Sequence, residues 1–274
     1  MNDLDRVAKR GLVLLGCGKM GSAMLAGWLK RGLEPGAVWV MDPRPSEWLQ
    51  GLAAKGLHLN TDLPEDPAIV LVAVKPQMMA EALPKLTPLG DGTTLFLSVA
   101  AGTPISYYET VLGTATPVIR AMPNTPAAIG RGITALTGNG PATELDMELA
   151  ETLLSAVGQT VRLEGEHQMD AVTAVSGSGP AYVFHLIETL AAAGEAEGLP
   201  ANLAMQLAKA TVAGAGALAM EAEEDPAQLR VNVTSPGGTT AAALGVLMDA
   251  DTGFPPLLKR AVKAAADRGR ELGK

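Results

Sequence analysis

The sequence predicts a two-domain α/β protein, in which a mostly parallel, doubly wound sheet is followed by an all-helical domain. Three observations support this prediction. Short β-rich runs alternate with helical patterns over roughly the first 160 residues, which is typical of a parallel sheet covered on both faces. From about Met169 onward, Val, Ile and Thr become scarce and long Ala-, Leu- and Glu-rich segments dominate. The glycine-rich stretch Gly16–Gly21 directly follows the first apolar run, where such a sheet carries its ligand site.

Several apolar runs in the first region have the length and composition of buried strands. They are residues 12–15, 38–41, 69–74, 94–99 and 118–121. Two further runs, 133–136 and 160–163, could add strands at the edge of the sheet. Between the first two runs, residues 22–31 predict a helix that Gly32 ends.

The second region has helical periodicity almost throughout. Its predicted helices cover residues 170–198, 201–224, 239–250 and 256–272, the first of them interrupted by Gly-Ser-Gly-Pro. We place the boundary near residue 168, so the predicted domains are 1–168 and 169–274. A small helical domain rich in Ala and Gly is expected to dimerise, because a second copy would complete its core.

The composition excludes several classes of protein. Of the 274 residues, 47% are hydrophobic and 18% are charged, which excludes a disordered chain. The net charge of −8 argues against a nucleic-acid-binding surface, although backbone dipoles can still hold a small anion. Cys17 is the only cysteine, so no internal disulfide can form, which fits a reducing compartment. His58, His167 and His185 lack metal-ligand spacing, and no metal site is expected.

The sequence indicates a soluble, cytoplasmic protein without a membrane partner. The N-terminal residues are mixed in charge, and the apolar run after them is too short for a signal sequence. The most apolar later segment, Ala208–Met220, contains Lys209 and is shorter than the roughly 20 residues of a membrane span. No role is assigned to the first ten residues.

The first glycine cluster, Gly16-Cys17-Gly18-Lys19-Met20-Gly21, has the Gly-x-Gly-x-x-Gly spacing of a dinucleotide-binding loop. The first glycine of this pattern permits a tight turn, the second lets a pyrophosphate approach the backbone, and the third lets helix and strand pack closely. Free amides at the helix N-terminus attract the phosphates. The sequence therefore predicts a Rossmann domain that binds NADP or NAD, with an ordinary glycine turn as the alternative.

Two residues after the second predicted strand make opposite predictions about the cofactor. Asp42 would accept a hydrogen bond from a ribose 2′-hydroxyl and repel a 2′-phosphate. Arg44 could instead bind that phosphate, or be an ordinary solvated surface charge. The choice between NADPH and NADH therefore stays open.

Two more strand ends carry candidate cofactor contacts, because ligands bind at the carboxyl ends of such strands. Ala73-Val74-Lys75-Pro76 closes the third predicted strand, and Ser98-Val99-Ala100-Ala101-Gly102 closes the fourth. Small side chains there leave room for a ribose and a nicotinamide ring. Lys75 could be catalytic or could contact the cofactor. We favour contact, because a general acid requires a perturbed pKa.

The second glycine cluster, Ser235-Pro236-Gly237-Gly238-Thr239-Thr240, precedes a predicted helix. Its glycines free the backbone to wrap around a ligand, and Thr239 and Thr240 offer amides and hydroxyls at the positive end of that helix. A substrate carboxylate fits there without an arginine. A simple helix cap is the alternative, but it would require only one of these side chains.

A third motif, Ser176-Gly177-Ser178-Gly179-Pro180-Ala181-Tyr182, interrupts a helical pattern. Such a break either kinks a helix for packing or admits a ligand. The residues alone favour neither alternative.

Taken together, these motifs resemble pyrroline-5-carboxylate reductases over nearly the whole chain. The matching blocks are Gly16–Gly21, Ala73–Pro76, Ala100–Gly102, Arg120–Pro126, Ser176–Tyr182 and Ser235–Thr240. The resemblance implies a Rossmann domain followed by a helical dimerisation domain. It also implies homodimers that interlock through their helical domains and often assemble into decamers, with the substrate site at the dimer interface.

The resemblance also implies roles for individual residues. Glu223, Gly238, Thr239 and Thr240 would line the substrate site. Asn232 would contact the cofactor, as would Ala73, Val74, Lys75, Pro76, Ala100 and Ala101. Most members of the family prefer NADPH, whereas Asp42 argues for NADH.

The implied reaction adds hydride from the nicotinamide to the C=N carbon of 1-pyrroline-5-carboxylate, giving L-proline. Thr240 is the candidate catalytic residue, since its hydroxyl would hydrogen-bond the ring nitrogen. A β-hydroxyacid dehydrogenase is one alternative, but it would need a catalytic lysine in the helical domain. Lys209 is the only lysine in Met169–Asp249 and lacks that context. A non-catalytic NADP-binding sensor is the other alternative, but it would have no need of the second glycine cluster.

Overall fold

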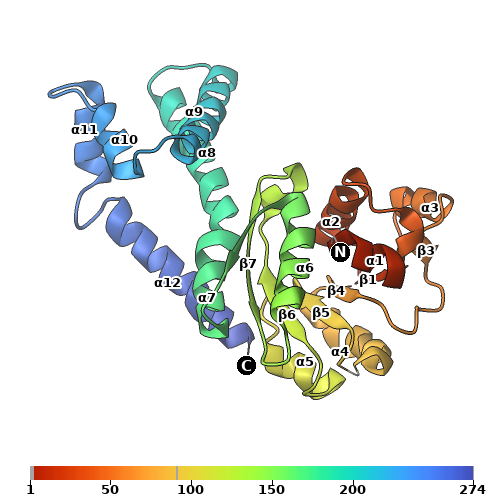
Figure 1. Cartoon of the computed structure of the whole chain (residues 1–274). Coiled ribbons are helices and arrows are strands. Elements are labelled where there is room, and N and C mark those ends of the chain that lie inside the picture. Colours follow the sequence, from red (N-terminus) through yellow and green to blue (C-terminus); the bar gives the residue numbers. More distant parts are fainter. Residues whose placement is uncertain (1–2, 91, 274) are drawn as a thin grey trace. The chain divides into compact units, whose positions relative to one another are not determined.

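The computed structural model describes residues 3–90 and 92–273. The chain divides into two compact units, one formed by Met1–Gly177 with Ala266–Lys274 and the other by Ser178–Ala265. We call them the α/β unit and the helical unit (Figure 1). The α/β unit extends beyond residue 168 to Gly177 and takes up the chain again at Ala266. The domain boundary near residue 168 stays a prediction.

The α/β unit is built on an eight-stranded sheet with the order β3-β2-β1-β4-β5-β6-β7-β8. Neighbouring strands run parallel except for the antiparallel pair β6 and β7. The mostly parallel sheet predicted from the sequence is therefore confirmed. The strands are β1 (Leu12–Leu15), β2 (Val38–Met41), β3 (His58–Leu59), β4 (Ile69–Val72), β5 (Leu95–Ser98), β6 (Val118–Met122), β7 (Gly132–Gly138) and β8 (Gly158–Arg162).

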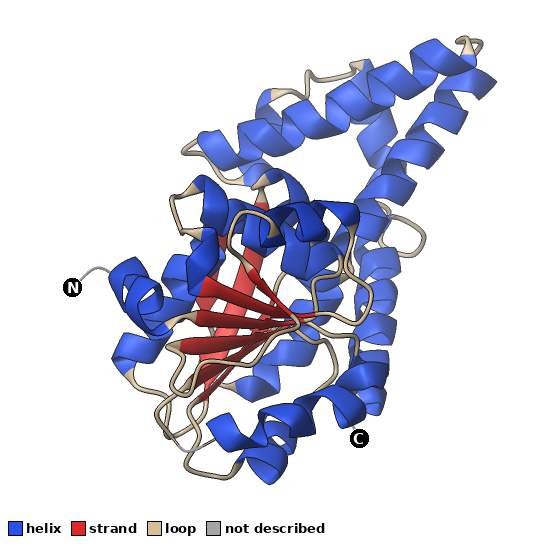
Figure 2. Ribbon diagram, turned by 90° about the vertical axis from the view of Figure 1, so that its right-hand side faces the viewer, coloured by secondary structure: helices blue, strands red, loops and turns tan. Residues whose placement is uncertain are grey.

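Helices cover both faces of this sheet (Figure 2). Side chains alternate along each strand, so Leu14 of β1 packs into one core and Val13 into the other. The first core also takes in residues of α1 (Asp3–Arg10), α2 (Lys19–Lys30), α3 (Glu47–Ala53) and α6 (Glu144–Leu154). The second takes in residues of α4 (Met79–Ala82), α5 (Ile105–Leu112) and the 3-10 helix Leu83–Leu89. Because β1, β2, β4 and β5 run parallel, their carboxyl ends lie at the same edge of the sheet.

The remaining helices belong mostly to the second part of the sequence. α7 (Met169–Val172) continues into a π-helical stretch, Thr173–Gly177, in the α/β unit. The helical unit contains α8 (Gly179–Ala196), α9 (Ala201–Glu221), α10 (Pro226–Asn232), α11 (Thr239–Leu247) and the first part of α12 (Phe254–Leu272). Short 3-10 helices occur at Pro35–Ala37, Pro76–Met78, Thr125–Ile129, Ser155–Val157 and Glu166–Gln168.

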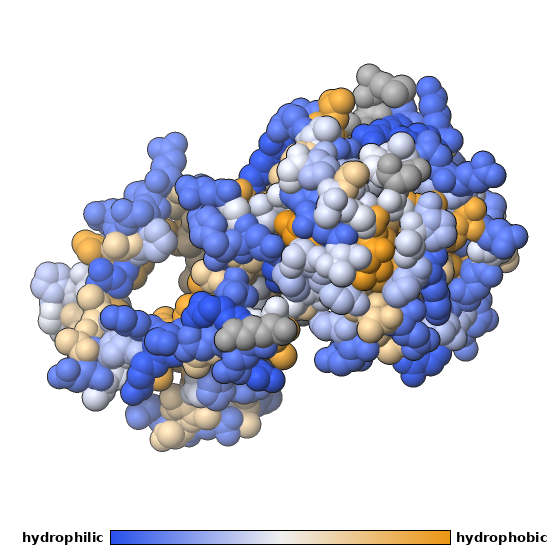
Figure 3. Space-filling model, turned by 90° about the horizontal axis from the view of Figure 1, so that it is seen from below, coloured by the Kyte–Doolittle hydropathy of each residue, from blue (hydrophilic) through white to orange (hydrophobic). Residues whose placement is uncertain are grey.

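The helical unit buries few side chains. Its buried cluster consists of Ala191, Ala204 and Ala208, where α8 packs on α9. Orange and tan apolar residues lie among blue hydrophilic ones on its surface (Figure 3). The large exposed ones include Phe184, Leu190, Leu203, Leu207, Leu218 and Met220. Apolar surface of this extent is expected where another protein surface packs.

Helix α9 corrects one expectation from the sequence. It has 21 residues, so the argument that its apolar segment is too short for a membrane span is wrong. Within the described residues, α9 alone is long and apolar enough to cross a membrane by length and composition, and 11% of its most apolar window is buried. The same exposed face is expected of a helix that packs on a second copy of the chain.

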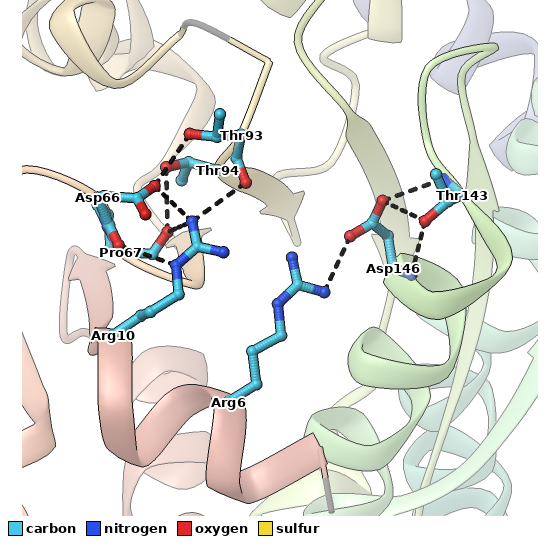
Figure 4. A network of polar contacts seen from close by, with 8 residues as sticks. All are labelled: Arg6, Arg10, Asp66, Pro67, Thr93, Thr94, Thr143 and Asp146. Atoms are coloured by element: carbon cyan, nitrogen blue, oxygen red, sulfur yellow. Dashed lines mark hydrogen bonds and ion pairs between the residues drawn. The ribbon is translucent and has the colours of Figure 1, made fainter. Parts of the chain in front are cut away.

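The N-terminal helix α1, to which the sequence assigned no role, is attached to the α/β unit at several points. Val7 is fully buried in the first core. Arg6 Nη1 lies 3.4 Å from Asp146 Oδ1 of α6, and Arg10 pairs with the carboxylate of Asp66 (Figure 4). Arg10 Nε also donates to the Asp66 carbonyl at 3.1 Å. These contacts make α1 part of the folded unit.

Candidate active site

The first glycine cluster forms a tight loop between β1 and α2. Gly16 has φ +88°, a conformation that favours glycine, and an added Cβ would lie 2.8 Å from Val74 Cγ1. A Cβ at Gly21 would lie 2.4 Å from the Gly16 carbonyl oxygen, so only glycine lets α2 approach the loop. A Cβ at Gly18, by contrast, would meet nothing within 4 Å. The loop therefore offers open space at the position where a dinucleotide pyrophosphate would approach the backbone.

The N-terminus of α2 faces that space with unpaired amides. Gly18 is the N-cap residue and provides no side-chain cap, and Lys19 begins the helix. The first amides of the helix therefore remain free to bind an anion. Cys17 is unsuited to chemistry, because burial, together with the charge of Asp42, raises the pKa of its thiol to about 11. Its thiol is protonated at neutral pH and packs against the first core.

Asp42 is held by backbone amides on both sides. Its Oδ2 accepts the Cys17 N–H at 2.8 Å and its Oδ1 accepts the Arg44 N–H at 2.8 Å. Asn60, with φ +53°, accepts the Asp42 N–H at 2.9 Å and donates to the Asp42 carbonyl at 2.8 Å. The Arg44 side chain is exposed. Asp42 thus ties the glycine loop to the end of β2.

Asn60 is a site residue that the sequence reasoning missed. The available signal is its position directly after the short β3, since Asn is one of the few residues that adopt a positive φ readily. Asn60 and Asp42 also line a cavity of about 190 Å³ at the ends of β1 and β2. The rest of its lining is Leu15, Met41, Pro43, Val74, Met78, Glu81, Ala82 and Lys85. A mostly apolar lining with a few polar groups suits a flat nucleotide base.

The ends of β4 and β5 complete this edge of the sheet. Ala73 and Val74 are half-buried and lie against the glycine loop, where Ala73 Cβ is 3.5 Å from the position of a Cβ on Gly21. Lys75 and Pro76 are exposed. Ala100 is buried and Ala101 is half-buried. The structure thus brings the cofactor candidates of the α/β unit to one edge.

The second glycine cluster lies in the helical unit. Gly237 has φ +70°, and the Gly238 N–H donates to the Ser235 carbonyl at 3.0 Å, which closes a tight turn. Gly238 is the N-cap of α11 and provides no side-chain cap. Thr239, exposed, and Thr240, half-buried, are the first two helical residues. The predicted helix start is confirmed, and its first amides are free for an anion.

Two other candidates occupy nearby segments of the helical unit. Glu223 is exposed in the turn between α9 and α10. Asn232 is the last residue of α10, and its Oδ1 accepts a hydrogen bond from Gln228 Nε2 at 2.7 Å. The candidate substrate residues and Asn232 therefore belong to the helical unit, whereas the other cofactor candidates belong to the α/β unit.

The helix break near Ser176 is a π-helical stretch rather than a kink at a proline. Gly177 packs closely on β6, since an added Cβ would lie 2.4 Å from Cε of Met122, the flexible end of a side chain that would have to shift. Asn124 Nδ2 donates to Ser176 Oγ at 3.4 Å, and Asn124 Oδ1 accepts the Ile133 N–H at 3.0 Å. Packing thus accounts for part of this motif, and π-helical turns are frequent at functional sites.

Comparison with known proteins covers both parts of the chain. Residues 166–272 match the family model described as pyrroline-5-carboxylate reductase dimerisation. Residues 11–102 match the model described as NADP oxidoreductase coenzyme F420-dependent. The chain is 38% identical over 264 residues to the pyrroline-5-carboxylate reductase of Pseudomonas aeruginosa, covering 95% of this chain and 96% of that protein. It is also 38% identical over 266 residues to that of Glycine max, covering 95% of each chain.

Solved structures give the same result. The pyrroline-5-carboxylate reductase of Coxiella burnetii superimposes with a TM-score of 0.89 at 34% identity, covering 97% of this chain and 99% of that one. The pyrroline carboxylate reductase of Plasmodium falciparum, solved with NADP bound, gives 0.82 at 28% identity, covering 96% and 98%. The predicted fold, a Rossmann domain followed by a helical dimerisation domain, is confirmed.

Proposed function

This chain belongs to the pyrroline-5-carboxylate reductase family, and we propose that it reduces 1-pyrroline-5-carboxylate to L-proline with NADPH, the last step of proline biosynthesis. One observation carries the proposal beyond a cofactor-binding fold. The glycine turn at Gly237 leaves the N-terminus of α11 uncapped, with Thr239 and Thr240 as its first residues. The chain thereby has a binding site for a small carboxylate in addition to its NADP-binding half. A protein that only senses the cofactor would not need this second site.

In this proposal, the α/β unit holds the cofactor. The open space at Gly18 and the free amides of α2 fit a pyrophosphate, and the cavity beside Asn60 fits the adenosine end. Ala73–Pro76, Ala100 and Ala101 contact the nicotinamide half, and Asn232 contributes from the helical unit. When bound, the cofactor supplies the hydride that reduces the C=N carbon.

The cofactor preference depends on Asp42 and Arg44. Both oxygens of the Asp42 carboxylate accept backbone amides, so we assign it to holding the glycine loop rather than to reading the ribose. The exposed Arg44 guanidinium is then the group that binds a 2′-phosphate. This assignment favours NADPH over NADH.

The helical unit holds the substrate. The amides of Gly238, Thr239 and Thr240 bind the carboxylate, and Glu223 lines the ring. The Thr240 hydroxyl hydrogen-bonds the ring nitrogen and orients the imine toward the hydride donor. If the imine arrives protonated, the reaction requires no further acid from the protein.

The assembly completes the proposal. We assign the exposed apolar surface of the helical unit to a homodimer interface, in agreement with the dimerisation model that matches residues 166–272. A soluble, cytoplasmic decamer, built from such dimers, is the larger assembly that we propose. Light scattering of the purified protein measures the number of chains directly.

The test is oxidation of NADPH and NADH, in parallel, with 1-pyrroline-5-carboxylate. We expect turnover that yields proline, faster with NADPH. Faster turnover with NADH would overturn the assignment of Arg44. No turnover with either cofactor, in protein that still binds both, would overturn the proposed reaction.

A further inference from the structure

The loop between β5 and α5, residues 99–104, carries Ala100 and Ala101 and connects two elements of the second core. Gly102 within it has φ +73°. A loop at a binding site must be held in one conformation, since a mobile loop would lose entropy when the ligand binds.

A single buried phenol joins the two ends of the loop. Tyr108, the fourth residue of α5, is 0% exposed. Its hydroxyl shares a 2.5 Å hydrogen bond with Oγ of Ser98, the last residue of β5. Because Ser98 precedes the loop and Tyr108 lies in the helix that follows it, this hydrogen bond links the two sides of the loop.

The same connection reaches the backbone of the loop. Ser98 Oγ accepts the Ala100 N–H at 3.2 Å. Ala100 is one of the proposed cofactor contacts. The chain of hydrogen bonds Tyr108–Ser98–Ala100 thus fixes the loop amide two residues beyond the strand.

A second anchor holds the start of α5. Arg120 of β6, which is paired in register with Ser98, forms a 2.6 Å ion pair with Glu166 Oε1. The same oxygen accepts the Ile105 N–H at 2.9 Å. The carboxylate therefore stabilises the N-terminus of α5 independently of the phenol. Because this anchor remains when the phenol is changed, the helix is expected to stay folded.

The hydroxyl of Tyr108 is not needed to fill the core, since phenylalanine would occupy nearly the same volume. Burial raises the pKa of Tyr108 to about 12, so the group stays a neutral hydroxyl at physiological pH. Its hydrogen bonds are what distinguish it from phenylalanine at this position.

We propose that Tyr108 is a positioning residue of the cofactor site, whose hydroxyl holds loop 99–104 in the conformation that receives the nicotinamide half of the cofactor. This inference rests on the proposed function, because it takes Ala100 and Ala101 as cofactor contacts. Tyr108 itself acts through Ser98, whose Oγ accepts the Ala100 N–H.

The test compares Tyr108→Phe with wild type and with Tyr107→Phe, which removes a neighbouring, half-buried hydroxyl. NADPH binding is measured by fluorescence titration without substrate, and amide hydrogen exchange is followed over residues 99–104. For Tyr108→Phe we expect a roughly three- to tenfold higher Kd for NADPH, the effect of one lost hydrogen bond, together with faster exchange in the loop. KM for NADPH should rise in parallel, while KM for the imine stays unchanged. Tyr107→Phe should match wild type in all of these.

A purely structural role for Tyr108 would lower the melting temperature and leave the Kd and the loop exchange unchanged, which would overturn the inference. If Tyr108→Phe does not fold, Ser98→Ala removes the same hydrogen bond and carries the same expectation. A wild-type protein that binds NADPH but reduces no imine would overturn the proposed function alone, since the binding and exchange comparison would still decide the role of Tyr108.

Discussion

The α/β unit and the helical unit bury their apolar side chains to very different extents. In the α/β unit, two cores cover the sheet, and Trp28, Phe96 and Tyr108 are almost completely buried. In the described part of the helical unit, the buried cluster is made of three alanines, while Phe184 is 59% exposed. One unit thus completes its own core, and the other presents apolar surface that a second copy of the chain would cover.

The two proposed ligand sites also differ in how closely their glycines are packed. The cofactor loop depends on close packing inside one unit, as the steric requirement at Gly21 shows. The turn before α11 has open surroundings, since a Cβ at Gly237 would meet nothing within 4 Å. We therefore expect substitutions in the α/β unit to act through folding and cofactor binding, and those in the helical unit through association and substrate binding.

The largest expected effect is the loss of the homodimer that we propose for the helical unit. Phe184→Asp places like charges at the proposed interface, which should raise the dimer dissociation constant by roughly 100-fold or more. Light scattering at several protein concentrations measures it, and activity should fall with the loss of dimer. Leu145→Asp, at a position 66% exposed on α6, is the matched control and should leave the assembly unchanged. Dimers that persist in Phe184→Asp would show that this residue lies outside the interface.

Smaller effects are expected from two glycine substitutions in the α/β unit, one of which changes packing and the other cofactor binding. Gly21→Ala forces a methyl group against the Gly16 carbonyl and should cost about 1–3 kcal/mol of unfolding free energy. Gly18→Ala meets open space, so its stability should stay within about 0.5 kcal/mol of wild type. Its methyl group occupies the space assigned to the pyrophosphate, so the Kd for NADPH should nevertheless rise. Denaturant unfolding and NADPH titration give both values. Unchanged NADPH affinity in Gly18→Ala would contradict the placement of the cofactor.

Thr240→Ala tests the helical unit's part in the reaction. Loss of the hydrogen bond to the ring nitrogen should lower kcat by roughly tenfold or more, with the Kd for NADPH nearly unchanged. Thr239→Ala is a useful comparison, because its backbone amide still binds the carboxylate. Steady-state kinetics with varied imine measures both variants. A normal kcat in Thr240→Ala would remove this residue from the mechanism.

The smallest expected effect concerns pH and lies on the surface of the α/β unit. Hydrogen bonds from Arg162 lower the pKa of Glu151 below its ordinary value of 4.5. A lowered pKa in the folded state stabilises the protein above that ordinary value, and the contribution is lost as the pH falls. Arg162→Gln should therefore reduce stability at pH 7 by less than about 1 kcal/mol and change it little at pH 3. Melting curves at both pH values test this, and an equal loss at both would contradict it.

The sequence predicted some elements of the fold closely and missed others. The runs 12–15 and 38–41 became β1 and β2 with the same bounds, because a fully apolar run is recognisable without its neighbours. β3 has only two residues, and α1 is rich in charge, so neither carries a strong local pattern. The place of α1 depends on contacts such as Arg6 with Asp146, far along the chain, and that of β3 on its pairing with β2.

The candidate site also has residues that the sequence predicted and residues that only the fold brings together. The sequence by itself determined the glycine loop and the start of α11, because steric freedom and helix-end amides are properties of a few consecutive residues. Only the tertiary structure decided that Asp42 binds the amide of Cys17, that Asn60 closes the turn beside it, and that Tyr108 hydrogen-bonds Ser98 across the loop after β5. These roles come from hydrogen bonds whose partners the fold brings together, and hydrogen bonds depend on distance in space rather than on spacing in the chain.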